Sequence, residues 1–297
     1  MSAARAIAAA SPDPSGSLAP SGPDPLPRAE WQAWSTHALE YEALLSPITA
    51  AAIEPMLTAI TPLSARDLLD VACGTGNLLA VAAARGARAT GLDASDGMLA
   101  IARSRIAGAS VVKGDARAMP FSDGSFDAVT CGFALGHMRE PIAALREAAR
   151  VLRPGGVLAF SAWLGADEGF AAHAIVARAF WAHGASAPRL PASRCLLDER
   201  SVVRKLLRDT GFGPTVFEPG ETVSRHRTAS EAMRTLQQAH PVIETLLDAQ
   251  PLPARASIAR AIERDLEGRR AGSWITLRWP FVVATTHRRS SAARADG

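Results

Sequence analysis

Glycine and aspartate residues lie at the spacing of a nucleotide-binding unit. A short apolar run, residues 66–72, contains Asp70 and leads into Gly74 and Gly76, and Asp93 follows about 20 residues after this loop. Glycine lets a backbone turn tightly and approach a ligand closely. A carboxylate placed like Asp93 typically accepts hydrogen bonds from ribose hydroxyls. These residue types suggest a nucleoside-binding loop, although a lone Gly-x-Gly equally fits a plain turn.

The elements that must position these residues form a strand–helix–strand unit. Residues 66–72 are apolar enough for a buried strand, residues 78–85 favour a helix, and residues 87–92 predict a second strand. Asp70 and Asp93 then lie near the carboxyl ends of two strands. Open α/β sheets bind their ligands at that edge.

The loop distinguishes between two kinds of cofactor. Dinucleotide folds use G-x-G-x-x-G, in which the third glycine permits close packing of helix on strand. Leu79 stands at that third position, which disfavours an NAD-dependent dehydrogenase. A site for a nucleoside joined to an amino acid needs no room for a pyrophosphate, and the sequence fits such a site better.

Four segments in order carry a more specific signal. They are DLLDVACGTG (residues 67–76), GLDASDGML (91–99), GDARAMPFSDGSFDAV (114–129) and RVLRPGGVL (150–158). Together they resemble the motifs of class I S-adenosylmethionine-dependent methyltransferases, and more narrowly the small-molecule enzymes of ubiquinone and menaquinone biosynthesis. The resemblance covers roughly residues 66–163. It implies an α/β fold, namely a Rossmann-like, seven-stranded, mostly parallel sheet with helices on both faces and an added helical cap.

The resemblance also implies how the cofactor, S-adenosyl-L-methionine, would be held. The backbone of Gly74 and Gly76 would lie against its methionine part. Asp70 would receive its ammonium, directly or through water, and Asp93 would take its ribose hydroxyls. The backbone carbonyl of Cys131, just after the fourth strand, lies near where the family contacts the ammonium. Taken singly, Asp93 also fits a helix cap and Cys131 an inert buried thiol.

A second set of residues would hold the adenine. Ala94 and Met98 would line the ring, Asp115 would accept from its amino group, and the Ala116 N–H would meet a ring nitrogen. Met98 alone equally fits a core residue, and Asp115 a turn residue. The complete set implied as cofactor-binding is Tyr41, Asp70, Ala72, Gly74, Gly76, Asn77, Asp93, Ala94, Met98, Asp115, Ala116 and Cys131.

Residues 31–60 predict a helical segment ahead of the first strand. Trp31, Trp34 and Tyr41 share one helix face with Ala38. In the methyltransferases that the chain resembles, an early helix of this kind often covers the cofactor, and its tyrosine hydroxyl reaches the cofactor carboxylate. We therefore predict a lid in which Tyr41 contacts the cofactor. An amphipathic helix packed on the core is the alternative.

His137 is the candidate for acid–base chemistry. It follows the predicted fourth strand, residues 126–133, at the carboxyl edge of the sheet. Methyl transfer from a sulfonium is an in-line displacement in which positioning supplies much of the rate, so a base is needed only for a poor nucleophile such as a phenol. We predict His137 as a catalytic residue, with a pocket-lining role as the alternative. The carboxylate cluster of metal-dependent O-methyltransferases is not found, so no metal site is predicted.

The C-terminal half departs from the four motifs. Helices are predicted over residues 166–183 and 198–208, and strands over 214–218 and 272–286. The intervening residues 221–271 are too many for a hairpin loop and predict a helical cap insertion. Long excursions usually carry function, so we expect the cap to bind substrate; an oligomerisation surface is the alternative. The helices predicted within the cap are residues 231–238, 242–248 and 254–267.

Composition sets the limits of the folded domain. Hydrophobic residues make up 48% of the 297 residues and charged residues 21%, and six of the 20 prolines lie among the first 27 residues. Residues 1–30 therefore predict disorder, as do residues 287–297, which leaves residues 31–286 as the methyltransferase domain. The apolar stretch 6–10 is too short for a signal peptide. No apolar run reaches the ~18 residues that span a membrane, so we expect a cytoplasmic protein.

The net charge of +3 does not indicate a nucleic-acid partner. The two tails carry −1 and +2, which leaves +2 on the rest of the chain. The Asn/Asp-Pro-Pro-Tyr/Phe signature of amino-group methylation is absent after the predicted fourth strand. Cys73, Cys131 and Cys195 form neither a disulfide framework nor a zinc spacing. We expect a small-molecule acceptor, no nucleic-acid or membrane partner, and a monomer or homodimer.

The sequence therefore predicts an enzyme that methylates an O, N or C atom of a small, apolar or aromatic metabolite. The alternative is an enzyme of this fold that binds the cofactor but catalyses cyclisation or decarboxylation, because the motifs report cofactor binding only. The intact glycine loop and both carboxylates disfavour a non-catalytic scaffold. The aromatic residues that favour an apolar acceptor site, each of which equally fits the core, are Phe170, Phe180, Trp181, Trp274 and Trp279.

Overall fold

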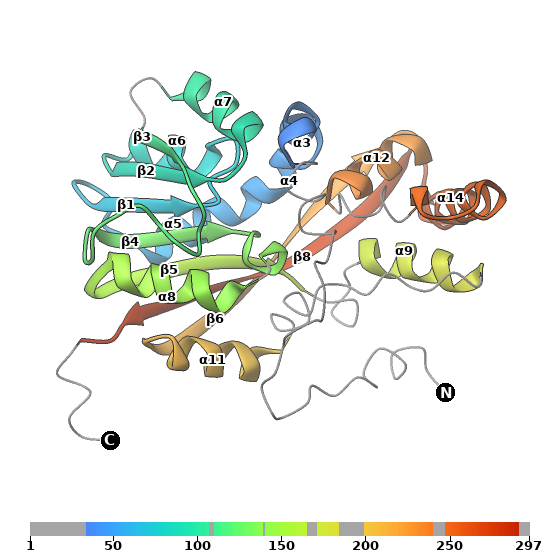
Figure 1. The fold of residues 1–297 in the computed structure, drawn as a ribbon. Coiled ribbons are helices and arrows are strands. Elements are labelled where there is room, and N and C mark those ends of the chain that lie inside the picture. The colour runs from blue at the N-terminus through green and yellow to red at the C-terminus, as the bar shows by residue number, and fades with distance from the viewer. Residues whose placement is uncertain are drawn as a thin grey trace.

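A single sheet runs through the computed structural model and carries helices along its length (Figure 1). The structure describes residues 34–106, 110–138, 140–164, 171–183, 199–239 and 247–290. The predictions for residues 1–30, for Trp31 and for Cys195 lie outside the described residues. Among the helices that are described, none is both long enough and apolar enough to cross a bilayer.

Five parallel strands bring the motifs to one edge of the sheet. β1 pairs with β2 and β4, and β3 and β5 extend the sheet on either side. Two antiparallel strands complete the order β3-β2-β1-β4-β5-β8-β6, and the short β7 pairs with β8. The predicted Rossmann-like, mostly parallel sheet is confirmed. The strands are β1 Asp67–Val71, β2 Arg88–Asp93, β3 Ser110–Lys113, β4 Phe126–Gly132, β5 Leu152–Trp163, β6 Phe212–His226, β7 Arg270–Ala271 and β8 Trp274–Arg288.

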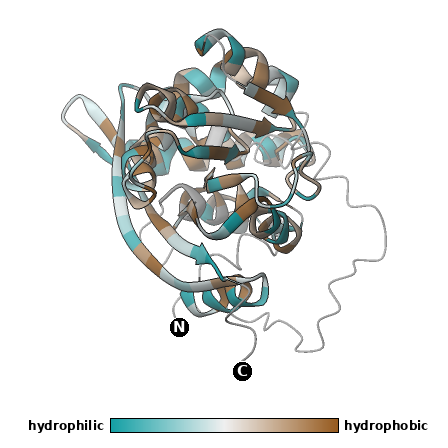
Figure 2. Cartoon of the chain, turned by 90° about the vertical axis from the view of Figure 1, so that its left-hand side faces the viewer, coloured by the Kyte–Doolittle hydropathy of each residue, from teal (hydrophilic) through white to brown (hydrophobic). Residues whose placement is uncertain are grey.

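Helices cover both faces of the sheet, which explains why the central strands are continuously apolar. Leu68 packs into the cluster under α5 and α6, whereas its neighbour Leu69 belongs to the cluster under α8 and α11. Hydrophobic residues, brown in Figure 2, accordingly lie along the central strands and the helices against them. These helices are α5 Ile53–Ala59, α6 Asn77–Ala84, α8 Pro141–Val151 and α11 Arg200–Asp209, and α7 Asp96–Arg105 follows β2.

The predicted helix of residues 31–60 is a series of short segments. α3 spans Ala38–Leu44, α4 spans Ser46–Thr49, and a 3-10 turn, Ala50–Ala52, leads into α5. Proline lacks an N–H and is tolerated only in the first turn of a helix. Pro47 and Pro55 each fall in the first turn of a new segment, so the chain restarts its helix instead of continuing it.

Strands β6 and β8 form a ribbon that extends beyond the parallel sheet (Figure 1). β5 ends at Trp163, opposite Phe281, but β6 and β8 continue to pair as far as His226 and Ile275. The strand predicted at 214–218 is therefore present, but its predicted length was wrong, because residues 221–226 of the predicted cap insertion are also strand. Pro219 is tolerated because β6 is an edge strand.

The far part of the ribbon carries the cap helices, which have a hydrophobic core of their own. α9 (Ala171–Ala182), α12 (Ala229–Ala239) and α14 (Leu252–Glu267) bury Phe180, Leu236 and Ile262 against Trp279 of β8. Leu45 and Ile48 from the N-terminal segments join the same cluster. The cap thus packs directly on the predicted lid. The predicted third cap helix, residues 254–267, lies entirely within α14, whereas residues 242–246 of the predicted second one lie outside the described residues.

The C-terminal end of the fold differs from its prediction. His287 and Arg288 belong to β8, and the N–H of Arg289 donates to the carbonyl of Gly211 at 3.0 Å. These residues were predicted to begin a disordered tail. Their polar and basic composition gives no local signal for a strand. They are strand because they pair with β5 and β6, which are distant in the sequence.

Candidate functional site

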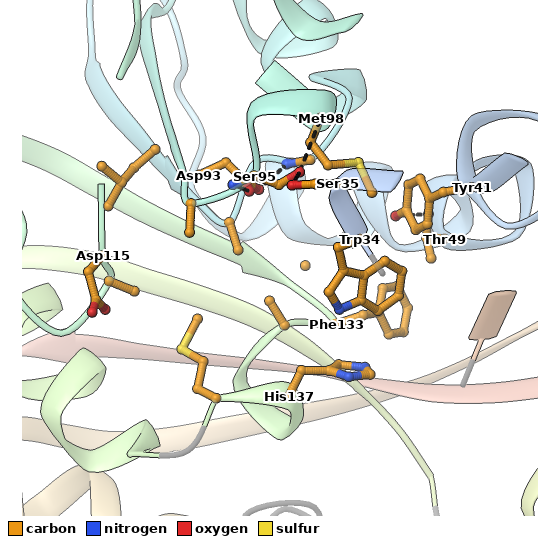
Figure 3. A pocket seen from close by; sticks show the side chains of 18 of the residues that line it. Trp34, Ser35, Tyr41, Thr49, Asp93, Ser95, Met98, Asp115, Phe133 and His137 are labelled. Atoms are coloured by element: carbon orange, nitrogen blue, oxygen red, sulfur yellow. Dashed lines mark hydrogen bonds between the residues drawn. The ribbon is translucent and has the colours of Figure 1, made fainter. Parts of the chain in front are cut away.

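A cavity of about 670 Å³ opens at the carboxyl ends of β1, β2 and β4. It lies between the N-terminal helices and the loops that follow these strands (Figure 3). Four predicted site residues do not line it: Asp70, Gly76, Asn77 and Cys131. The other nine do: Tyr41, Ala72, Gly74, Asp93, Ala94, Met98, Asp115, Ala116 and His137.

The glycine loop is braced by Asp93. One carboxylate oxygen of Asp93 accepts from the N–H of Gly74 at 2.8 Å, and the other accepts from the N–H of Ser95 at 2.9 Å. Gly74 has a φ of +53°, and a Cβ built on it would meet no atom within 4 Å. The loop therefore presents bare backbone to the cavity, and Asp93 fixes that backbone in place. Burial raises the pKa of Asp93, against the effect of these hydrogen bonds.

Gly76 contributes to helix packing and does not line the cavity. It caps the N-terminus of α6 with a φ of +82°, a left-handed conformation that glycine adopts without cost. A Cβ on Gly76 would lie 3.1 Å from the Cβ of Ala102 in α7. The second glycine of the motif thus lets α7 approach the loop, a role that spacing alone did not reveal.

Asp70 lies beneath the loop as a buried carboxylate with a raised pKa. Its side chain is 4% exposed and accepts a hydrogen bond from the Thr130 hydroxyl at 2.7 Å. Burial raises the pKa of Asp70 to about 7, and the nearby charge of Asp93 adds to this effect. A carboxylate in this position is stabilised by any cation that approaches it. Cys131 is also buried, and burial raises its thiol pKa to about 12, so it is an inert thiol.

Asp115 lies at the opposite end of the cavity and is bound by a residue that the prediction missed. The carboxylate of Asp115 accepts from the backbone N–H of Arg117 at 2.8 Å and from its guanidinium at 2.7 Å. These interactions hold the pKa of Asp115 below its usual range. The guanidinium of Arg117 also faces Glu140 at 3.4 Å, so one side chain joins the two loops that flank this end.

The N-terminal segments form the third wall. The hydroxyl of Tyr41 faces that of Thr49 at 3.4 Å, and burial raises the phenol pKa. The Trp34 ring meets the Tyr41 ring edge to face with centroids 5.6 Å apart. Figure 3 shows Trp34 reaching toward His137 on the other wall. The predicted lid thus reaches the cavity through a tryptophan as well as through its tyrosine.

The far wall is aromatic, and the described residues that form it carry no carboxylate or ammonium group. Phe133 stacks on Trp163 with centroids 3.9 Å apart, although its backbone has a φ of +55°. Such a φ is strained for a bulky residue and marks functional sites. The N–H of Phe133 donates to the hydroxyl of Ser161 at 3.1 Å, which supports this conformation. Neither Phe133 nor Trp163 was predicted as a site residue, although Phe133 ends the predicted strand of residues 126–133 and Trp163 ends the range that the family resemblance covers.

His137 lies on the aromatic side of the cavity. It ends a short 3-10 turn, Leu135–His137, after β4. Its ring meets the Trp34 ring edge to face with centroids 5.5 Å apart. A proton acceptor is thus present in an otherwise apolar part of the cavity. Within the described parts of the chain, no three His, Cys, Asp or Glu residues gather closely enough to hold a metal ion.

The comparisons with known proteins match the part of the chain that builds this site. Residues 69–160 match the family model described as a methyltransferase domain. A demethylmenaquinone methyltransferase of Clavibacter sepedonicus is 46% identical over 101 residues, which are 33% of this chain and 41% of that protein. The chain therefore spans about two fifths of the length of that curated relative.

Solved structures show the same fold over a larger part of the chain. A Bacillus halodurans C-125 protein, provisionally named a methyltransferase, superposes with a TM-score of 0.53 at 20% identity, covering 80% of this chain and 99% of that one. A SAM-dependent methyltransferase of Thermotoga maritima gives a TM-score of 0.51 at 19% identity, covering 87% and 100%. At such identities the likeness concerns the fold.

Proposed function

From the premise that residues 69–160 form a methyltransferase domain, we propose that this protein transfers a methyl group from S-adenosylmethionine to a small, apolar or aromatic acceptor. The observation that carries the proposal is the composition of one cavity. The glycine loop, an end lined by Asp93, Met98 and Asp115 (the nucleoside end), and an uncharged aromatic wall all border the same space of about 670 Å³. Such a cavity suits two reactants held side by side.

The glycine-loop end suits the amino-acid part of the cofactor. Gly74 exposes backbone where a side chain would fill the open space, so a ligand can lie directly against the loop. Asp70 lies beneath this loop, and within the described part of the chain its hydrogen-bond and charge contacts are Thr130 and Asp93, neither of which is cationic. An ammonium group would supply the missing positive charge, either directly or through water.

The nucleoside end suits a ribose and an adenine. A carboxylate offers about four lone-pair sites, and the two backbone hydrogen bonds to Asp93 leave others for hydroxyl groups. Met98, which is 4% exposed, adds an apolar surface for a base. Asp115 would share its carboxylate between Arg117 and an adenine amino group, since Arg117 already donates to both oxygens.

The aromatic wall then holds the acceptor. S-Adenosylmethionine supplies an electrophilic methyl group on a sulfonium. The side chains of Trp34, Phe133 and Trp163 exclude water and orient a flat or apolar acceptor, and such positioning accounts for much of the rate of a two-reactant displacement. His137 would accept the proton of a hydroxyl acceptor and is dispensable for a stronger nucleophile.

Two measurements test the proposal in sequence. Calorimetric titration with S-adenosylhomocysteine should show binding, and the absence of binding would overturn the proposal. Incubation of the protein with methyl-labelled S-adenosylmethionine and a fractionated extract of its host should transfer the label to a small molecule. If the cofactor binds but S-adenosylhomocysteine never forms while another compound is consumed, the protein catalyses a cyclisation or decarboxylation instead.

A further inference from the structure

The N-terminal helices α3 and α4, which we call the lid, present two rows of side chains. Tyr41, Leu45 and Thr49 recur every four residues and line the cavity. Glu42 and Ser46 lie one residue further along the helix and make contacts outside the cavity lining. Residues four apart share a helix face, so the lid has one face toward the cavity and a polar face beside it.

The polar face of the lid is bound to the glycine loop. The amide of Asn77, the first residue of α6, donates to the hydroxyl of Ser46 and to that of Thr75 at 3.2 Å. The guanidinium of Arg105 donates both to the side-chain amide oxygen of Asn77 and to the Glu42 carboxylate. One arginine thus joins the lid to the residue that directly follows Gly76. Asn77 was predicted to contact the cofactor, and the structure instead gives it these partners.

The residues that lead into the lid are also held, at the other end of α7. Arg105 is the last residue of α7, and Ser95 caps its first turn. The hydroxyls of Ser35 and Ser95 lie 2.9 Å apart. Gly97 permits this approach, because a Cβ there would lie 2.2 Å from the carbonyl oxygen of Ser35. The chain from Ser35 to Glu42 is therefore attached at both ends of α7, the helix whose first turn borders the cavity.

The ion pair at the centre of these contacts is partly shielded from water. The side chains of Glu42 and Arg105 are each 29% exposed. Burial opposes ionisation of Glu42, but the Thr75 hydroxyl and Arg105 outweigh it and lower the pKa of this carboxyl. By contrast, a second ion pair between the same N-terminal region and the core, Arg85 with Glu54, is 40% and 63% exposed. Exposed pairs contribute little to stability.

We propose that Glu42, Ser46, Asn77 and Arg105 form a latch that couples lid closure to the conformation of the glycine loop. The inference rests on the proposed function, because it assigns these four as positioning residues for the cofactor. When the latch is formed, Tyr41 and Thr49 face the cavity and the glycine loop is fixed beneath them. When it is broken, the lid opens and the binding-competent state is less populated, which weakens apparent affinity in proportion.

The experiment measures the affinity for S-adenosylhomocysteine and the hydrogen exchange of residues 38–49 in the full chain. Arg105→Met should raise the Kd about tenfold and accelerate exchange in residues 38–49 even without ligand. Glu42→Gln, which keeps the shape of the side chain and removes its charge, should act in the same direction with a smaller effect. Arg85→Met is the matched control, because it breaks the exposed ion pair to Glu54 and should leave both readouts unchanged.

The outcomes separate the latch from the proposed function. A wild-type protein that does not bind S-adenosylhomocysteine would overturn the proposed function, and with it the assignment of cofactor positioning. A wild-type protein that binds, together with an Arg105→Met variant of equal affinity and equal exchange, would overturn the latch alone. If Arg105→Met lowers only the melting temperature, the contacts are structural and the coupling is refuted.

Discussion

The side chain of Leu79 occupies the space that a β-carbon on Gly91 would need. An ideal Cβ built on Gly91 lies 2.5 Å from Leu79 Cδ1 and 2.7 Å from the sulfur of Cys73. In dinucleotide folds a glycine on the helix allows the helix to approach the strand. Here the helix residue is a leucine and the glycine lies on β2. The close packing of α6 on the sheet is therefore retained with the small residue on the other partner.

Gly91→Ala should consequently destabilise the protein. Leu79 is fully buried, and the added methyl group would lie 2.5 Å from its Cδ1, so it overpacks the core at a cost of about 2 kcal/mol. Gly213→Ala is the control, since its Cβ would meet its nearest atom at an ordinary 3.6 Å. Urea denaturation of the two variants measures the difference. Equal midpoints would show that the core around Leu79 can relax.

The sequence alone predicted the parallel strands and most of the motif residues that line the cavity, because both depend on local sequence patterns. The spacing from Gly74 to Asp93 places the two residues on neighbouring strand ends wherever a strand–helix–strand unit forms. The role of Asn77 could not be predicted in this way. Its partner Ser46 lies 31 residues earlier, in a helix whose orientation depends on the cap as well as on the sheet.

The aromatic wall was missed for a related reason. Phe133 and Trp163 meet only because β4 and β5 are paired in a particular register, with Gly132 opposite Ser161. A one-residue change in register would turn each strand's side chains to the other face. The strand predicted at 214–218 stops before Pro219 and Gly220, whereas β6 continues through both residues to His226. The ring of Phe281 lies over Gly220, within 2.4 Å of where its Cβ would be, and this packing continues the strand.

Asp70→Asn should stabilise the protein at neutral pH while it weakens cofactor binding. The folded-state pKa of Asp70 is raised to about 7, against about 3.9 in an unfolded chain. The folded state therefore binds the proton more tightly, and the contribution of Asp70 to stability is lost as pH rises between these values. Asparagine can still accept from Thr130 and carries no charge. At about pH 8 the variant should gain on the order of 2 kcal/mol relative to wild type.

The pH dependence supplies the control for this prediction. At about pH 4, where the Asp70 carboxyl is largely protonated in the folded state, the stabilities of the two proteins should converge. Denaturant unfolding at both pH values measures the difference. A stability difference that is the same at both would mean that Asp70 does not titrate in this range. The Kd for S-adenosylhomocysteine should rise about tenfold or more in the variant, since the ammonium loses its anionic partner.

Tyr41→Phe should weaken the binding of S-adenosylhomocysteine without altering the lid. Burial keeps the phenol protonated, so its hydroxyl can donate to a carboxylate. Removal of one such hydrogen bond raises the Kd about fivefold. Phenylalanine retains the edge-to-face contact with Trp34. The variant therefore tests the contribution of the hydroxyl separately from that of the ring. Calorimetry measures the affinity, and an unchanged Kd would assign Tyr41 to packing alone.

His137→Phe should lower the turnover of a hydroxyl acceptor while leaving cofactor affinity intact. General base catalysis by a positioned side chain contributes about a hundredfold or more, so single-turnover rates with the labelled acceptor should fall by about that factor. Phenylalanine preserves an aromatic ring opposite Trp34, 5.5 Å away in the native protein, but has no nitrogen that can accept a proton. Because the lid contact is kept, a loss of rate at saturating acceptor points to proton transfer. Normal turnover would instead show that His137 lines the acceptor site, and would favour an acceptor atom that needs no base.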